Sequence, residues 1–179
     1  MKNKNELSTK IIVKDAIITI QTMDKSMSYD VWQNSLDEDN RRFVPDEVFE
    51  TLEEAGFVID SLIKSYENDN GPFVYAIIRN EDQKNLGYVQ LIKLGEEWEI
   101  GYHIAKKFTG NGYATNAVKL FLEYLTENRI VKDILGIALK DNKASIKVLQ
   151  KCDFSLIYDG VGLYQGKKRK IVRYIKNLW

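Results

Sequence analysis

The segment from residue 98 to residue 139 constrains the fold of this chain more than any other part of the sequence. A strand pattern over residues 98–104 leads into a glycine-rich turn, a helical pattern over about 112–128 and a second strand pattern over 133–139. A strand, a long helix and a strand in this order predict a parallel pair joined by a right-handed crossover. Open sheets bind ligands where the strand pattern changes direction, so we expect a ligand at this crossover.

The rest of the chain predicts an antiparallel framework around that crossover. Polar turns separate the strand patterns 73–79, 86–94 and 98–104, which indicates a meander. A capping box of Thr51 and Glu54 predicts the start of a helix that continues to about Tyr66. We therefore predict one α+β domain over residues 1–179: a mixed, mostly antiparallel central sheet with helices on both faces and one parallel β-α-β crossover. Further strands are expected at 11–13, 17–22, 154–158 and 169–176, helices near 29–32 and at 143–151, and a loop at 36–42.

Charge and residue counts exclude several classes of protein. Lys and Arg number 26 and Asp and Glu number 26, so the formal net charge of zero disfavours a protein built to neutralise nucleic-acid phosphates. The single cysteine, Cys152, and the single histidine, His103, exclude a disulfide framework and a metal centre of several His or Cys ligands. No apolar run approaches the ~18 residues of a membrane helix. We expect a cytoplasmic protein with no membrane partner.

The turn before the long helix predicts an anion site. It contains Gly110 and Gly112, which permit positive φ and close approach of a ligand to the backbone. Backbone amides at a helix start lack partners inside the helix, and the helix dipole makes that end positive. Phosphates bind at such ends. The spacing is not G-x-G-x-x-G, so a dinucleotide site is weakly supported, and a tight structural turn is the alternative.

Four motifs in register make the sequence resemble the GNAT superfamily of N-acetyltransferases, and within it the RimJ/RimL-type branch that acetylates ribosomal-protein amino termini. Residues 107–112 resemble the fingerprint Arg/Gln-x-x-Gly-x-Gly/Ala, with Lys107 in first place. Residues 99–102 read Glu-Ile-Gly-Tyr, and residues 112–117 read Gly-Tyr-Ala-Thr-Asn-Ala. Residues 142–154 resemble Asn-x-x-Ser-x-x-x-Leu-x-Lys-x-Gly-Phe. The chain departs from the branch at Asn116, which replaces Glu, and at Asp153, which replaces Gly.

This resemblance implies a GNAT-like acyl-CoA N-acyltransferase fold and acetyl-CoA as cosubstrate, without a metal. The amides of the turn would hold the coenzyme A pyrophosphate, and the pantetheine arm would lie in a V-shaped opening between strands 98–104 and 133–139. Lys107 keeps a positive charge near the phosphates but lacks the bidentate fork of arginine. The implied coenzyme-binding residues are Ile104, Lys107, Phe108, Thr109, Gly110, Asn111, Gly112, Tyr113, Ala114, Asn142 and Ser145.

Acetyl transfer to an amine needs a base for the amine and an acid for the departing thiol. Strand alternation places Glu99 and His103 on one face, and the resemblance marks Glu99 as a base acting through water, with His103 as a second candidate. Many family members carry a Tyr acid where this chain has Leu149; in the ribosomal-protein branch Ser145 is the proposed substitute. Each of these residues also has a structural interpretation. Glu99 could simply lie on the polar face of a strand, His103 could be a structural histidine, and Ser145 could cap a helix.

The acceptor is the least determined part of the prediction. By resemblance, the stretch 36–45 covers the acceptor, so Trp32, Arg41, Arg42 and Phe43 are candidate lining residues, with an ordinary surface loop as the alternative. We predict acetylation of a protein or peptide α-amino group by a monomer or homodimer. Alternatives are a small amine such as a polyamine, amino acid or aminoglycoside, and a coenzyme A sensor without activity. The basic run 166–170 indicates a solvated hairpin turn, with a nucleic-acid or acidic-substrate contact as the weaker interpretation.

Overall fold

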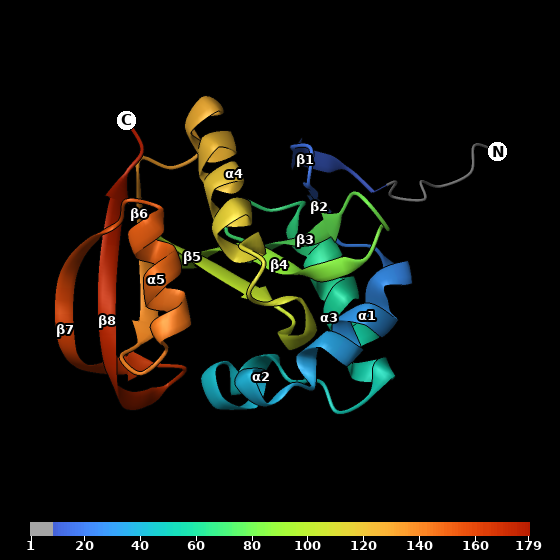
Figure 1. The fold of residues 1–179 in the computed structure, drawn as a ribbon, viewed down its shortest axis with the longest axis horizontal. Helices are drawn as coiled ribbons and strands as arrows, with labels where there is room; N and C mark the ends of the chain where they lie inside the picture. Colours follow the sequence, from blue (N-terminus) through green and yellow to red (C-terminus); the bar gives the residue numbers. More distant parts are fainter. Residues whose placement is uncertain (1–8) are drawn as a thin grey trace.

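A single eight-stranded sheet organises residues 9–179, the part of the chain that the computed structural model describes. Its strand order is β1-β2-β3-β4-β5-β6-β8-β7, and helices cover both faces (Figure 1). All neighbouring strands are antiparallel except β5 and β6, which are parallel. This confirms the predicted fold class and the single crossover. The strands are β1 (Ile11–Lys14), β2 (Ile18–Thr22), β3 (Phe73–Arg79), β4 (Asn85–Leu94), β5 (Glu97–Ile104), β6 (Asp133–Leu139), β7 (Ser155–Tyr164) and β8 (Lys167–Asn177).

Five α-helices and three short 3₁₀ turns connect these strands. The capping box predicted at Thr51 is present, because its side chain accepts from the amide of Glu54 while the Glu54 carboxylate accepts from the amide of Thr51. Among the described residues, no helix has the length and apolar composition needed to cross a bilayer. The helices are α1 (Ser28–Ser35), α2 (Glu38–Phe43), α3 (Leu52–Ser65), α4 (Tyr113–Glu127) and α5 (Lys143–Lys151), and the 3₁₀ turns are η1 (Lys25–Met27), η2 (Pro45–Glu47) and η3 (Lys106–Phe108).

Two local predictions were wrong. The stretch 36–42 is not a loop, because Asp37 caps α2 by accepting from the amide of Asn40 at 2.9 Å, with acidic residues in the first turn and basic residues in the last. The final hairpin is longer than predicted, because its turn lies at Gln165 and Gly166, both at positive φ. The first strand of the hairpin, β7, continues past residue 158 and includes Gly162, where a Cβ would lie 2.5 Å from Ile171 Cδ1 on β8.

The two faces of the sheet have separate cores. On one face α4 and α5 cover a large apolar cluster that includes Phe121 and Leu125, each about 1% exposed. On the other face α1 and α3 cover a smaller cluster built on Ile59 and Val74. Because β5 alternates between the faces, Glu99, Gly101 and His103 share one face, as predicted, and that face is the α1–α3 side.

The crossover strands form a fork. β5 and β6 pair at one position, Glu99 with Leu135, near the start of both strands. Beyond it β5 stays paired with β4, whereas β6 pairs with β8 over its full length. The fork therefore opens toward the carboxyl ends of β5 and β6, where η3 and α5 begin.

Candidate active site

The glycine turn has the backbone conformation that its sequence predicted. Gly110 and Gly112 adopt φ values of 84° and 81°, and Gly112 is the N-cap of α4 without any side-chain cap. No atom lies within 4 Å of the place a Cβ would occupy at either glycine, so the turn is open to solvent. A group outside the protein can approach this backbone closely.

The protein itself uses two of the amides expected to bind an anion. The amide of Phe108 donates to Ala105 O at 2.8 Å, and that of Thr109 donates to Lys106 O at 3.2 Å. The Asn111 side chain also supports the turn, since its Nδ2 donates to the carbonyls of Phe108 and Thr109. Over the described residues, no protein partner accepts from the backbone amides of residues 110–115. The anion donors are therefore displaced toward the start of α4.

The remaining coenzyme candidates lie around this turn. Lys107 is exposed, with its Nζ 5.1 Å from the centre of the Phe108 ring. The Tyr113 hydroxyl accepts from Arg79 Nη1 at 3.4 Å. Ile104 is 7% exposed in the α4-side core, so only its main chain can face a ligand. Ala114 lies in the first turn of α4.

Glu99 lies at the closed end of the fork. Burial raises its pKa to about 7, against the smaller opposing effects of the Ile137 amide on β6 and of Arg173. The negative charge of Glu47 raises it further. A carboxyl group with a pKa near 7 can accept or release a proton at neutral pH.

Glu47 is a second buried carboxylate that the sequence did not reveal. It lies in η2, where its Oε1 accepts from Gln90 Nε2 at 3.3 Å and its Oε2 is buried without a partner among residues 9–179. Burial raises its pKa to about 7 as well. Gly101 makes this contact possible, because a Cβ there would lie 2.5 Å from Gln90 Nε2. Two protonatable carboxyl groups thus face the same cleft.

Ser145 reaches the fork from the opposite face of the sheet. Its Oγ lies 3.0 Å from the hydroxyl of Tyr102, which also contacts Ser145 O at 2.9 Å. Burial raises the pKa of Tyr102, so its hydroxyl keeps its proton. Asn142 caps α5 by accepting from the amide of Ser145 at 3.1 Å, and both residues line the cleft.

His103 lies outside the fork. It lies four positions after Glu99 along β5, which at about 3.4 Å per residue places the two residues roughly 14 Å apart. Burial lowers the pKa of His103, and its Nε2 is 3.7 Å from Asp37 Oδ2. Glu99 and Ser145 therefore line the same cleft, whereas His103 lines the neighbouring cavity on the α1–α3 face.

The predicted acceptor residues divide into two groups. Arg41 forms a bidentate pair with Glu50, and Arg42 pairs with Asp141 at 2.7 Å. Arg41, Arg42 and Phe43 line a cavity of about 270 Å³ that adjoins the cleft at the β7–β8 hairpin. Trp32 packs edge-on against Tyr29 and lines neither the cleft nor this cavity.

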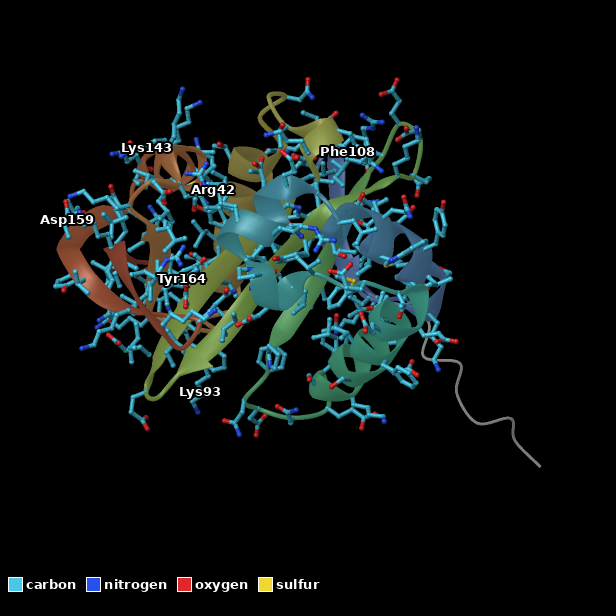
Figure 2. The ribbon with its side chains drawn as sticks, turned by 90° about the horizontal axis from the view of Figure 1, so that it is seen from below. Arg42, Lys93, Phe108, Lys143, Asp159 and Tyr164 are labelled. Carbon is cyan, nitrogen blue, oxygen red and sulfur yellow. The ribbon has the colours of Figure 1, made fainter. Side chains whose placement is uncertain are left out.

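The cleft between these groups has a volume of about 310 Å³. The end of β7 closes one side with Tyr164, which lies between the hairpin and the central strands in Figure 2. Burial raises the pKa of Tyr164 to about 12, with further contributions from Glu99 and Glu47. Sequence reasoning missed Tyr164 because it ended the first strand of this hairpin at residue 158, whereas β7 continues to Tyr164. Within the described part of the chain, no three His, Cys, Asp or Glu side chains gather as a metal site would require.

Known proteins share this architecture. The sequence-family description "Acetyltransferase (GNAT) domain" matches residues 19–155. A GNAT-family acetyltransferase from Bacillus anthracis has a TM-score of 0.79 at 18% identity, covering 93% of this chain and 98% of its own. RimL, a ribosomal α-N-protein acetyltransferase solved with coenzyme A, has a TM-score of 0.80 at 16% identity, covering 94% and 98%. An acetyltransferase from Salmonella typhimurium that modifies a ribosomal protein's N-terminal serine has a TM-score of 0.77 at 16% identity, covering 94% and 99%.

The chain therefore belongs to the GNAT acetyltransferases. Two positions at which its motifs differ from those of the ribosomal-protein enzymes have a clear local setting. Asn116 Nδ2 donates to Asp15 Oδ2 at 2.8 Å, and a glutamate at this position would face that carboxylate with like charge. Asp153 adopts a φ of 61°, the left-handed conformation that glycine would take more easily.

Proposed function

We propose that this protein transfers the acetyl group of acetyl-CoA to a primary amine, in particular an α-amino group of a peptide or protein. The observation that carries the proposal is the pair of carboxyl groups, Glu99 and Glu47, with pKa values of about 7 in the cleft at the β5–β6 fork. Such groups attract an ammonium ion and take up its proton near neutral pH. The alternative of an inactive coenzyme sensor gives no reason for the two costly buried carboxyl groups.

The glycine turn and the fork fit the parts of acetyl-CoA. The free amides of residues 110–115 at the start of α4 suit a diphosphate. The unpaired edges of β5 and β6 beyond Glu99 suit an arm containing amide groups. Asn142 and Ser145 face the cleft from α5, where the reactive end would lie. The coenzyme supplies the acetyl group as an activated thioester.

Glu99 acts on the acceptor amine. Above its pKa of about 7, its carboxylate accepts a proton from the ammonium through a water molecule. An α-amino group suits this base, because its pKa is about 7.7–8.0 whereas that of a lysine side chain is about 10.4. The neutral nitrogen then forms the C–N bond as the C–S bond of the thioester breaks. Holding the reactants in place contributes on the order of 7–11 kcal/mol to such a step.

Ser145 acts on the departing sulfur from the other face of the sheet. Its hydroxyl passes a proton to the thiolate while it takes up the proton that the acetylated nitrogen loses, and Tyr102 holds it in place through the 3.0 Å contact. The demand on this acid is small, since a thiol resembling that of cysteine has a pKa of about 8.5. Tyr102 is accordingly a positioning residue. The complete reaction releases one proton for each ammonium consumed.

The α-amino assignment also rests on similarity. RimL and the Salmonella typhimurium protein act on ribosomal protein amino termini, and this chain shares their fold at 16% identity. A small free amine is the second candidate, because the cavity beside the cleft has the size of a small-ligand site.

Acetyl-CoA at 100 times its dissociation constant should stabilise the protein by about 2.7 kcal/mol, read as a rise in melting temperature. Gly110→Ala should reduce this rise strongly, because a Cβ at positive φ strains the turn and crowds the bound phosphates. Subsequent thiol release with a panel of amines tests the transfer itself.

Gly95→Ala is the matched control. Gly95 also has positive φ, at 62°, with open space around its Cβ position, but it lies in the turn between β4 and β5. Gly95→Ala should melt at lower temperature yet keep the full response to acetyl-CoA. Equal responses of the two variants would contradict the pyrophosphate site, and no thiol release with any amine would contradict the transfer.

A further inference from the structure

A second cavity lies beside the cleft, on the α1–α3 face of the sheet. Its volume is about 370 Å³, within the ~300–1,000 Å³ range of small-ligand sites. Helices α1 and α3 and turn η2 cover it, and β3 and β4 form its floor. It shares four lining residues with the cleft, so the two cavities adjoin. These shared residues are Glu47, Tyr88, Gln90 and Ile92.

The wall of this cavity is largely apolar. Val58, Ile59 and Leu62 line it from α3, at the spacing that puts them on one side of the helix. Val74 and Ile92 line it from the sheet. An apolar surface of this kind suits a hydrocarbon or aromatic group.

One part of the cavity is instead polar, and that part is incompletely satisfied. Asn34, Asn40 and Asn85 line it and are 6%, 2% and 4% exposed. Within residues 9–179, Asn34 Oδ1, Asn40 Oδ1 and Asn85 Nδ2 have no hydrogen-bond partner. The other end of two of these amides is fixed, since Asn34 Nδ2 donates to Asn85 O at 3.1 Å and Asn85 Oδ1 accepts from the amide of Gly87 at 2.9 Å.

Buried polar atoms without partners destabilise a fold, and those that persist call for an explanation. Here they gather in one cavity, which also contains the unpartnered Oε2 of Glu47. A ligand with an apolar body and hydrogen-bonding groups would satisfy both parts of this cavity. Glu47 connects the cavity to the cleft, because it lines both.

We propose that this cavity holds the body of the acceptor. The acceptor is then a primary amine that carries a compact, bulky apolar group with a neutral hydrogen-bonding end. Its amino group lies at the shared wall, between Glu47 and Glu99, and its apolar group lies under α3. This inference rests on the proposed acetyl transfer and adds a substrate class to it. A free amine and the first residue of a peptide can both present this chemistry.

The test compares acceptors that differ in this group alone. With acetyl-CoA saturating, tyrosine amide and phenylalanine amide should show kcat/KM values at least tenfold above that of glycine amide. Val58→Phe fills the cavity and should reduce kcat/KM for tyrosine amide at least tenfold, while that for glycine amide changes less than twofold. Tripeptides that begin with Tyr or Gly form a second arm of the test. If the Tyr tripeptide is preferred as strongly as tyrosine amide, the acceptor is the amino terminus of a peptide. If only the amino acid amides show the preference, the acceptor is a small amine.

Leu52→Phe is the matched control, because Leu52 lies on the same helix, is 43% exposed and does not line the cavity. It should leave all acceptors unchanged. Equal kcat/KM for glycine and tyrosine amides, or equal losses for both in Val58→Phe, would overturn the inference while leaving the acetyl transfer standing. Calorimetric titration of tyrosine amide into the coenzyme A complex gives a readout that does not need turnover. Binding that Val58→Phe abolishes, without acetylation of any amine, would support the cavity and overturn the proposed transfer instead.

Discussion

Helices cover both faces of the sheet, but the side chains beneath them are packed differently on the two faces. Under α4 the side chains close into a continuous apolar core, in which Phe121, Leu125 and Leu149 are each about 1% exposed. Under α1 and α3 the buried cluster is small and leaves a cavity of about 370 Å³. Within the described residues, the buried polar side-chain atoms without partners lie on α1, α2, η2, β4, β5, β8 or the hairpin, and none lies on α4 or α5.

From this difference we infer that the α4 face stabilises the fold and the α1–α3 face binds a ligand. The α4 face fixes the position of the glycine turn, because the buried residues of α4 hold the helix start in place. The α1–α3 face retains space and unsatisfied polar groups, which lower stability and are useful only when a ligand meets them. Glu99 and Glu47 lie on this second side of the fork, and Ser145 and Tyr102 lie on the first.

The largest effect expected from this comparison concerns Glu99. Glu99→Gln should lower kcat/KM by about 10²–10⁴-fold near pH 7, the usual contribution of a general base. The loss should shrink above about pH 9, where an α-amine with a pKa of about 7.7–8.0 is already neutral. Thiol release measured from pH 6 to 10 checks this, with unchanged acetyl-CoA affinity as the control. A loss that is the same at every pH would remove Glu99 from proton transfer.

A second effect compares the packing of the two faces. Phe121→Ala should destabilise the protein by about 3–5 kcal/mol, as truncation in a filled core does. Leu62→Ala should cost far less, about 1 kcal/mol, because Leu62 already borders a cavity and only about half of its side chain is removed from water. Urea unfolding of both variants measures the difference. Equal costs would mean that the α1–α3 face is packed as tightly as the α4 face.

The smallest expected effect is a gain in stability on substituting Glu47, whereas the two substitutions above lower stability. Its pKa rises from 4.5 to about 7 on folding, so the native state binds more protons between these values and stability falls as pH rises through that window. Glu47→Gln lacks this penalty and should be more stable than wild type at pH 8, by on the order of 1–3 kcal/mol. At pH 4 the two proteins should be nearly equal. Urea unfolding at both pH values measures this difference. If the Gln variant is no more stable than wild type at pH 8, folding does not raise the pKa of Glu47.

The sequence could predict the parts of this site that depend on local spacing, but not the residues that long-range contacts bring to it. The glycine turn, the crossover and the strand face that carries Glu99 were predictable, because the local spacing of glycines and strand residues determines them. Glu47 was not, since nothing in Pro45-Asp46-Glu47 distinguishes it; it matters because η2 places it against Gln90, 43 residues away. Tyr164 was missed because the strand was expected to end at residue 158, whereas β7 continues to Tyr164 with Gly162 packed closely against Ile171 of β8.

The most direct test is a crystal structure of the protein with coenzyme A and N-acetyltyrosine amide, the product of the proposed reaction. We expect the diphosphate on the amides of residues 110–115, the acetamide between Glu99 and Ser145, and the tyrosine ring under α3. A diphosphate bound elsewhere, or a ring lying in solvent with the cavity closed, would contradict it.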